Sequence, residues 1–154
     1  ALRIRRKAYG PKHSNVALSL QVLARALHQT GPAKEAETLF REALVTLRDT
    51  KHWSQSHCEI GLGRLLVSTG RSAEAEPLLA DALATRIAND GETSAPADEA
   101  RLALGLCRLA QGRAAEARDL LAPALERQQG TNWAEADVLA EARAALSGLT
   151  PTAR

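Results

Sequence analysis

Apolar residues recur along this chain with the spacing of an α-helix. The first stripe has apolar side chains at i, i+3, i+4 and i+7 and consists of Leu20, Leu23, Ala24 and Leu27. A second stripe follows Gly31 and consists of Ala36, Leu39, Phe40, Ala43, Leu44 and Leu47. Because this spacing puts the apolar side chains on one face of a helix, the stripes predict an antiparallel helix pair joined by a tight glycine turn.

The same pattern occurs twice more. Residues 31–37 are Gly-Pro-Ala-Lys-Glu-Ala-Glu, residues 70–76 are Gly-Arg-Ser-Ala-Glu-Ala-Glu, and residues 112–118 are Gly-Arg-Ala-Ala-Glu-Ala-Arg. The glycines are 39 residues apart (31 to 70) and 42 residues apart (70 to 112). A unit repeated at such a period is typical of a solenoid, in which each unit buries its apolar face against its neighbours. The pattern therefore favours a binding surface over an active site.

The repeats divide the chain into a single array that spans residues 1–154. Its parts are the end of a preceding repeat (1–12), repeat one (13–51), repeat two (52–93), repeat three (94–130), a C-terminal capping helix (131–148) and a tail (149–154). We expect the capping helix to open at a capping box, Asn132 to Glu135, and to cover the apolar face of the third repeat.

Composition supports helices throughout. Hydrophobic residues make up 45% of the chain, but aromatic residues only 3%. Alanine, leucine, glutamate and arginine are strong helix formers, and β-branched and aromatic strand formers are scarce. The sequence therefore predicts an all-α fold with a core of small side chains.

Charge and cysteine usage narrow the choice of partner and compartment. The net charge of +2, from 20 basic and 18 acidic residues, does not favour nucleic acid as a partner. One basic cluster is interpreted as the solvated face of a helix and consists of Arg3, Arg5, Arg6, Lys7 and Lys12. No apolar run approaches the roughly 18 residues of a membrane span, so no membrane partner is expected.

Cys58 and Cys107 are interpreted as free thiols in separate helices, which favours a reducing compartment, the cytoplasm.

Catalytic and metal-binding motifs are missing from the sequence. It contains no Gly-x-Ser-x-Gly elbow, no Walker phosphate loop and no His-Glu-x-x-His motif. Serines at predicted helix starts are explained as caps and comprise Ser14, Ser54, Ser56 and Ser72. His52, His57 and Cys58 have no second cluster that would complete a tetrahedral metal site. We therefore expect no enzyme activity, no metal and no cofactor.

The repeat resembles the tetratricopeptide repeat. That family places a small residue in the middle of the first helix, glycine at the turn, alanine five residues later, a bulky residue nine later and alanine twelve later. The matching residues over about residues 14–128 are Ala24, Gly31, Ala36, Phe40 and Ala43; Gly63, Gly70, Ala75, Leu79 and Ala82; and Gly105, Gly112, Ala117, Leu121 and Ala124. The resemblance implies a right-handed α-solenoid of antiparallel helix pairs.

The long period is similar to that of kinesin light chain repeats. Residues 2–13, followed by Val16-Ala-Leu-Ser-Leu20, carry this likeness. Similar repeats occur in bacterial signalling proteins, including the C-terminal regions of Ser/Thr protein kinases. The asparagines that kinesin-type repeats present to peptide backbones are replaced here by Gln21-Val22 and Ile60-Gly61.

In this family the first helices line a concave groove that binds peptides. The resemblance places in the groove Gln21, Val22, Arg25, Gln29, His57, Ile60, Arg64, Ser68, Leu102 and Leu106, flanked by Leu18, Glu99 and Ala110. Arg25 and Arg64 occupy equivalent positions, so we expect them to lie along one groove wall. They are either anchors for an acidic peptide or solvated arginines that pair with neighbouring glutamates. Leu102, Leu106 and Leu109 fit a core beneath the last helix better than a ligand pocket.

Three functions follow from these features. The first is protein binding, with a peptide or partner protein in the groove. The second is a regulatory or oligomerising C-terminal region of a bacterial Ser/Thr kinase or a similar signalling protein. The third is self-association through open solenoid ends.

Overall fold

The chain folds into helices connected by short turns. The computed structural model describes residues 13–127 and 136–149. Within these ranges there are seven helices and no strands: α2 (Ser14–Thr30), α3 (Ala33–Asp49), α4 (Gln55–Ser68), α5 (Ser72–Asp90), α6 (Ala95–Ala110), α7 (Ala114–Arg127) and α8 (Ala136–Leu149). The predicted all-α fold is confirmed. The expected end of a preceding repeat, the basic cluster at its start and the capping box at Asn132 lie outside the described residues.

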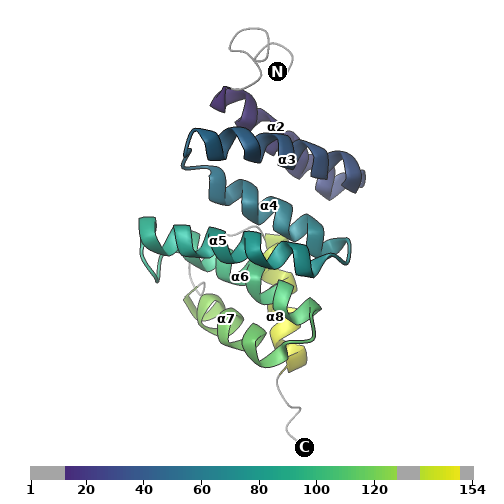
Figure 1. Ribbon diagram of the computed structural model, residues 1–154. Helices are drawn as coiled ribbons and strands as arrows, with labels where there is room; N and C mark the ends of the chain where they lie inside the picture. The colour runs from purple at the N-terminus through teal and green to yellow at the C-terminus, as the bar shows by residue number, and fades with distance from the viewer. Residues whose placement is uncertain (1–12, 128–135, 150–154) are drawn as a thin grey trace, which may run out of the picture.

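The first six helices form three antiparallel pairs that stack in chain order. The pairs are α2 with α3, α4 with α5, and α6 with α7. The second helix of each pair also packs against the first helix of the next pair, and the first helices α2, α4 and α6 contact one another in succession. Figure 1 shows this stack descending from α2 to α7. The predicted solenoid of helix pairs is confirmed.

Glycine in the first helices lets the two helices of a pair approach closely. A Cβ atom on Gly63 would lie 2.5 Å from Cδ2 of Leu79, and one on Gly105 would lie 2.7 Å from Cδ2 of Leu121. These distances are too short for a carbon contact, so each leucine of the second helix occupies the space above its glycine. The small-residue positions of the sequence pattern therefore mark where the helices of a pair cross.

The turns between the helices of repeats two and three depend on glycine. Gly70 and Gly112 both have φ of 78°, in the left-handed region that residues with a Cβ atom rarely adopt. The Gly70 amide donates to the carbonyl of Val67, and the Gly112 amide donates to that of Leu109. The two turns therefore close in the same way.

Buried side chains form two clusters. The first runs through the three pairs from Val16 to Cys107 and includes Phe40, Leu62 and Leu79. The second joins the third pair to α8 and consists of Leu102, Leu106, Leu121, Ala124, Leu125, Val138, Leu139 and Ala142. The expected core beneath the last helix is therefore present for Leu102 and Leu106, whereas Leu109 is only half-buried.

The last helix crosses the solenoid. In Figure 1, α8 (yellow) runs behind α6 at a steep angle and does not continue the stack below α7. It packs against α6 and α7. No helix of the described residues is long and apolar enough to span a membrane.

Candidate binding groove

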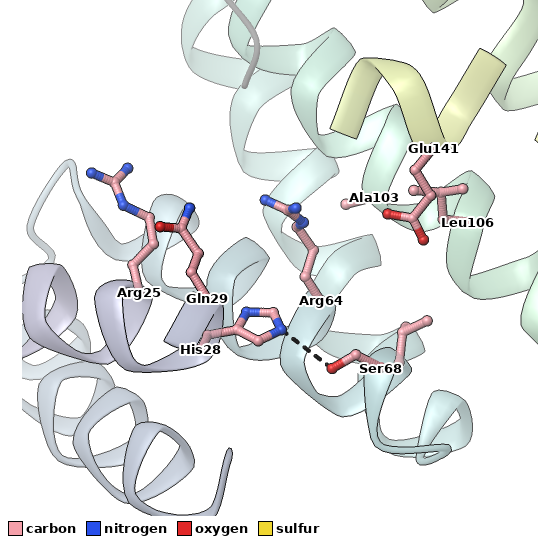
Figure 2. A pocket seen from close by; sticks show the side chains of 9 residues that line it. Arg25, His28, Gln29, Arg64, Ser68, Ala103, Leu106 and Glu141 are labelled. Atoms are coloured by element: carbon pink, nitrogen blue, oxygen red, sulfur yellow. Dashed lines mark hydrogen bonds between the residues drawn. The ribbon is translucent and has the colours of Figure 1, made fainter. Parts of the chain in front are cut away.

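The first helices and α8 together line an open pocket of about 270 Å³, which we call the arginine pocket. Its lining residues are Arg25, His28 and Gln29 of α2, Arg64, Val67 and Ser68 of α4, Ala103 and Leu106 of α6, and Glu141 of α8. Figure 2 shows their side chains around the pocket. The pocket thus spans all three repeats on the side formed by their first helices α2, α4 and α6, which we call the inner face.

Two arginines from successive repeats extend along this pocket. Arg25 and Arg64 each lie six residues before the turn glycine of their repeat. Their side chains extend in the same direction from α2 and α4 (Figure 2). Arg25 is exposed and Arg64 half-buried. The repeat geometry therefore brings two guanidinium groups to one pocket.

A hydrogen bond joins α2 to α4 beside the two arginines. His28 Nε2 lies 3.2 Å from Ser68 Oγ, and the same hydroxyl donates to the carbonyl of Leu65 at 2.8 Å. Because the single hydroxyl hydrogen of Ser68 is used by Leu65, His28 must donate from Nε2. This contact links the two first helices beside the pocket.

A second open pocket of about 380 Å³ lies beside the first, and we call it the tryptophan pocket. Its lining residues are Leu18, Gln21, Val22 and Arg25 of α2, Trp53 and Ser54 of the connection to α4, and His57 of α4. Trp53 is 69% exposed and Val22 is 60% exposed. Two of the large exposed apolar side chains of the described chain therefore line one pocket, and Arg25 belongs to both pockets.

His57 contacts both Trp53 and Arg86 at the tryptophan pocket. Its ring stands edge-on to Trp53, with ring centroids 6.0 Å apart. The Arg86 guanidinium of α5 donates to the ring and lies 3.0 Å from Nε2. Burial, then the positive charges of Arg86 and Arg25, lower the pKa of His57 to about 4, and Asp90 opposes them only weakly. His57 is therefore neutral near pH 7, and its 3.8 Å contact with Glu99 is not an ion pair at that pH.

The structure places most of the predicted groove residues at these pockets. Gln21, Val22, Arg25 and His57 line the tryptophan pocket, and Arg25, Gln29, Arg64, Ser68 and Leu106 line the arginine pocket.

Ile60 and Leu102 require a correction, because only 3% of Ile60 and none of Leu102 is exposed. Ile60 lies in the first buried cluster together with Ala100 and Ala103 of α6, and Leu102 lies in the second cluster with α8. Their placement on the groove surface was wrong, because both side chains are part of the buried core.

Six pocket residues were missed from the sequence: His28, Trp53, Ser54, Val67, Ala103 and Glu141. His28 lies one helical turn after Arg25, a spacing that could have indicated the same face. Trp53 lies in the connection between repeats, and Glu141 lies in the last helix. Neither position belongs to the first-helix register from which the groove was predicted.

The stack of helix pairs and its inner face define the class of this protein as an α-solenoid repeat protein. Three segments match models described as tetratricopeptide repeat, over residues 1–49, 60–88 and 99–123, which together cover more than half of the chain. The chain belongs to the tetratricopeptide repeat family, whose repeats are protein-interaction modules. No curated protein matches the chain.

Three solved structures share the fold of this chain. The crystal structure of BtubC (BKLC) from P. vanneervenii has a TM-score of 0.74 and 18% identity, over 87% of this chain and 55% of that chain. A P. anserina protein assigned to the kinesin light chains, with nearly identical TPR-like repeats, has a TM-score of 0.67 and 24% identity, over 86% and 64%. A single-residue variant of the latter has a TM-score of 0.69 and 24% identity, over 82% and 61%. This chain therefore spans only a little over half the length of the first of these proteins.

Proposed function

We propose that this chain binds an acidic segment of a partner protein along its inner face, with Arg25 and Arg64 as the anchors. The observation that carries the proposal is that these two arginines, one from each of two successive repeats, line one pocket. Guanidinium groups donate two parallel hydrogen bonds to a carboxylate, which provides both strength and direction. The proposal concerns a reducing compartment such as the cytoplasm, which two separate buried thiols, Cys58 and Cys107, support.

The apolar part of the groove gives such a segment a second kind of contact. Val22 and Trp53 are exposed at the tryptophan pocket, next to Arg25. Exposed aromatic and aliphatic side chains beside cationic groups are typical of interface centres. A partner segment with a carboxylate near an apolar side chain matches both surfaces at once.

The test is fluorescence anisotropy with acidic 15-residue peptides and their Gln/Asn counterparts. The double variant Arg25→Ala/Arg64→Ala should weaken binding of an acidic peptide at least about tenfold, since hydrogen bonds to charged groups contribute about 1.5–3 kcal/mol each. The matched control is Lys34→Ala/Arg41→Ala, which removes two exposed positive charges of α3 outside both pockets. Equal affinity of the two double variants would overturn the proposal.

A further inference from the structure

The last helix has one buried face, and that face contacts repeat three. Val138, Leu139 and Ala142 are 4%, 6% and 0% exposed, and Ala145 and Leu146 are partly buried behind them. Their buried neighbours are Leu102 and Leu106 of α6 and Leu121, Ala124 and Leu125 of α7. The helix therefore docks on the third repeat through an apolar row at i, i+1, i+4, i+7 and i+8.

The surface that α8 covers includes the inner face of the third repeat. Leu106 lies six residues before Gly112, which makes it the equivalent of Arg25 and Arg64 in the earlier repeats. Leu106 also lines the arginine pocket. A segment that followed the inner face from Arg25 past Arg64 would therefore meet α8 next.

The same helix brings a carboxylate to the arginine pocket. Glu141 lies between the buried residues Leu139 and Ala142 in sequence and lines the pocket together with Arg25 and Arg64. Figure 2 shows its side chain entering the pocket from α8, on the side of Ala103 and Leu106. The helix thus combines an apolar row with an acidic side chain, and both meet the groove.

We propose that α8 occupies the groove reversibly, that a helix of a partner protein can replace it there, and that this partner helix resembles α8 in sequence. The partner is an amphipathic helix with apolar residues spaced like Val138, Leu139 and Ala142 and a carboxylate at the place of Glu141. This is the mode in which an amphipathic helix lays its apolar face into a groove. The inference rests on the proposed function, because it assigns the class of ligand to the same inner face.

Tethering sets the strength of the competition. A segment held by a short connection has an effective concentration of about millimolar, so a partner helix of equal intrinsic affinity must reach that range to displace it. Cutting the connection removes this advantage. The occupancy of the groove by an added helix should then rise strongly at micromolar concentration.

The experiment places a protease recognition sequence between Arg127 and Ala136 of the full chain. The probe is a fluorescein-labelled synthetic peptide of residues 136–149. Anisotropy should show little binding to the uncut chain at about 10 μM peptide and at least tenfold tighter apparent binding after cleavage and dilution. Circular dichroism at 222 nm checks that the cut protein keeps its helices.

Variant peptides separate the two parts of the inference. Leu139→Asp in the peptide should abolish exchange, and Glu141→Gln should weaken it at least about threefold. Ala140→Gln changes an exposed position of the helix and should have no effect. Loss of helicity after cleavage, or a cut α8 that never exchanges, would show a permanent structural cap and overturn the inference. If the Glu141→Gln peptide exchanges as well as the unchanged peptide, α8 is exchangeable but the ligand need not be acidic, and that part of the inference is refuted. Failure of the proposed function would instead be seen in the Arg25→Ala/Arg64→Ala variant.

Discussion

Arg113 Nη1 lies 2.6 Å from Glu76 Oε1, and this ion pair joins the turn of the third repeat to the second helix of the second repeat. The same relationship occurs one repeat earlier, where Arg71 Nη1 lies 2.7 Å from Glu37 Oε2. Each arginine follows the turn glycine directly, and each glutamate lies six residues after the preceding turn glycine. An inter-repeat ion pair is therefore part of the repeat itself.

The third repeat reverses the sign at the glutamate position. Arg118 stands where Glu37 and Glu76 stand in the earlier repeats. Its guanidinium donates to the carbonyl of Leu149 in the last residue of α8. The glutamate of the inter-repeat pair therefore occurs only in repeats one and two. In repeat three, the arginine at this position contacts α8 instead.

Our first prediction concerns the coupling between Glu76 and Arg113. Hydrogen bonds from Gln111 and Arg113 lower the pKa of Glu76, so the carboxylate is stabilised in its charged form. A double-mutant cycle of Glu76→Ala and Arg113→Ala should give a favourable coupling that shrinks as salt rises, because the pair is partly exposed. Thermal denaturation measures this coupling, and the Tm of each variant should fall by no more than a few degrees. Asp81→Ala, at an exposed carboxylate of the same helix, is the control, and a coupling that is absent at low salt would contradict the prediction.

The second prediction concerns the close approach at Gly63. Gly63→Val should destabilise the protein by about 1–3 kcal/mol, because the new carbon atoms would overlap Leu79. Leu79→Ala alone should cost about 2–5 kcal/mol, since Leu79 is fully buried. In the double variant the valine refills the space that the leucine leaves. Urea denaturation should therefore show a loss smaller than the sum of the single losses, and strict additivity would refute the assigned contact.

The third prediction concerns a buried carboxylate in α6. Asp98 is 2% exposed and accepts hydrogen bonds from Arg127 of α7 at 2.6 and 2.8 Å and from Arg101 at 2.9 Å. Arg101 is itself only 9% exposed. Asp98→Ala should destabilise the protein by about 3–5 kcal/mol, because it leaves a buried positive charge without this partner. Chemical denaturation checks this value, and Asp119→Ala on the exposed side of α7 should change stability by less than about 0.5 kcal/mol.

The helix pairs were predictable because their signals are local. The contact of Gly63 with Leu79 follows from a small residue and a bulky residue at fixed distances from Gly70. Each signal lies within a single helix–turn–helix unit, and the unit recurs three times. Repetition makes such a pattern recognisable even though each copy alone is weak.

The depth of each groove residue could not be predicted in the same way. Ile60 and Arg64 lie one turn apart on α4, yet Ile60 is buried and Arg64 lines a pocket. Helical periodicity assigns both to one face but does not show how far the next repeat reaches over that face. That reach depends on how successive pairs stack, which is a property of the assembled array.

The serine caps were wrong for a related reason. Ser54 precedes α4 but has φ −81° and ψ −1°, a helical conformation in which its side chain makes no cap. Its hydroxyl instead donates to Gln21 Oε1 at 3.0 Å, which is a contact between repeats one and two. His13 caps α2 and Ser94 caps α6, both with extended backbone. Capping requires that extended conformation, which the residue type alone does not determine.

The last prediction concerns pH and His57. Its pKa of about 4 in the folded chain lies below the ordinary value of 6.5, so between these values the unfolded chain binds more protons than the folded chain. Stability should therefore fall as the pH decreases from about 6.5 towards 4. The carboxylates with lowered pKa, such as Glu76 and Glu116, add to the loss mostly as the pH falls past their ordinary value of 4.5. His57→Gln should remove the slope between pH 6.5 and 5, whereas His52→Gln should keep it because His57 is intact. The charged groups that face the His57 ring are Arg86, Arg25, Asp90 and Glu99. NMR titration of the ring measures its pKa directly. A midpoint near 6.5 would mean that burial and the two arginines do not control the protonation of His57.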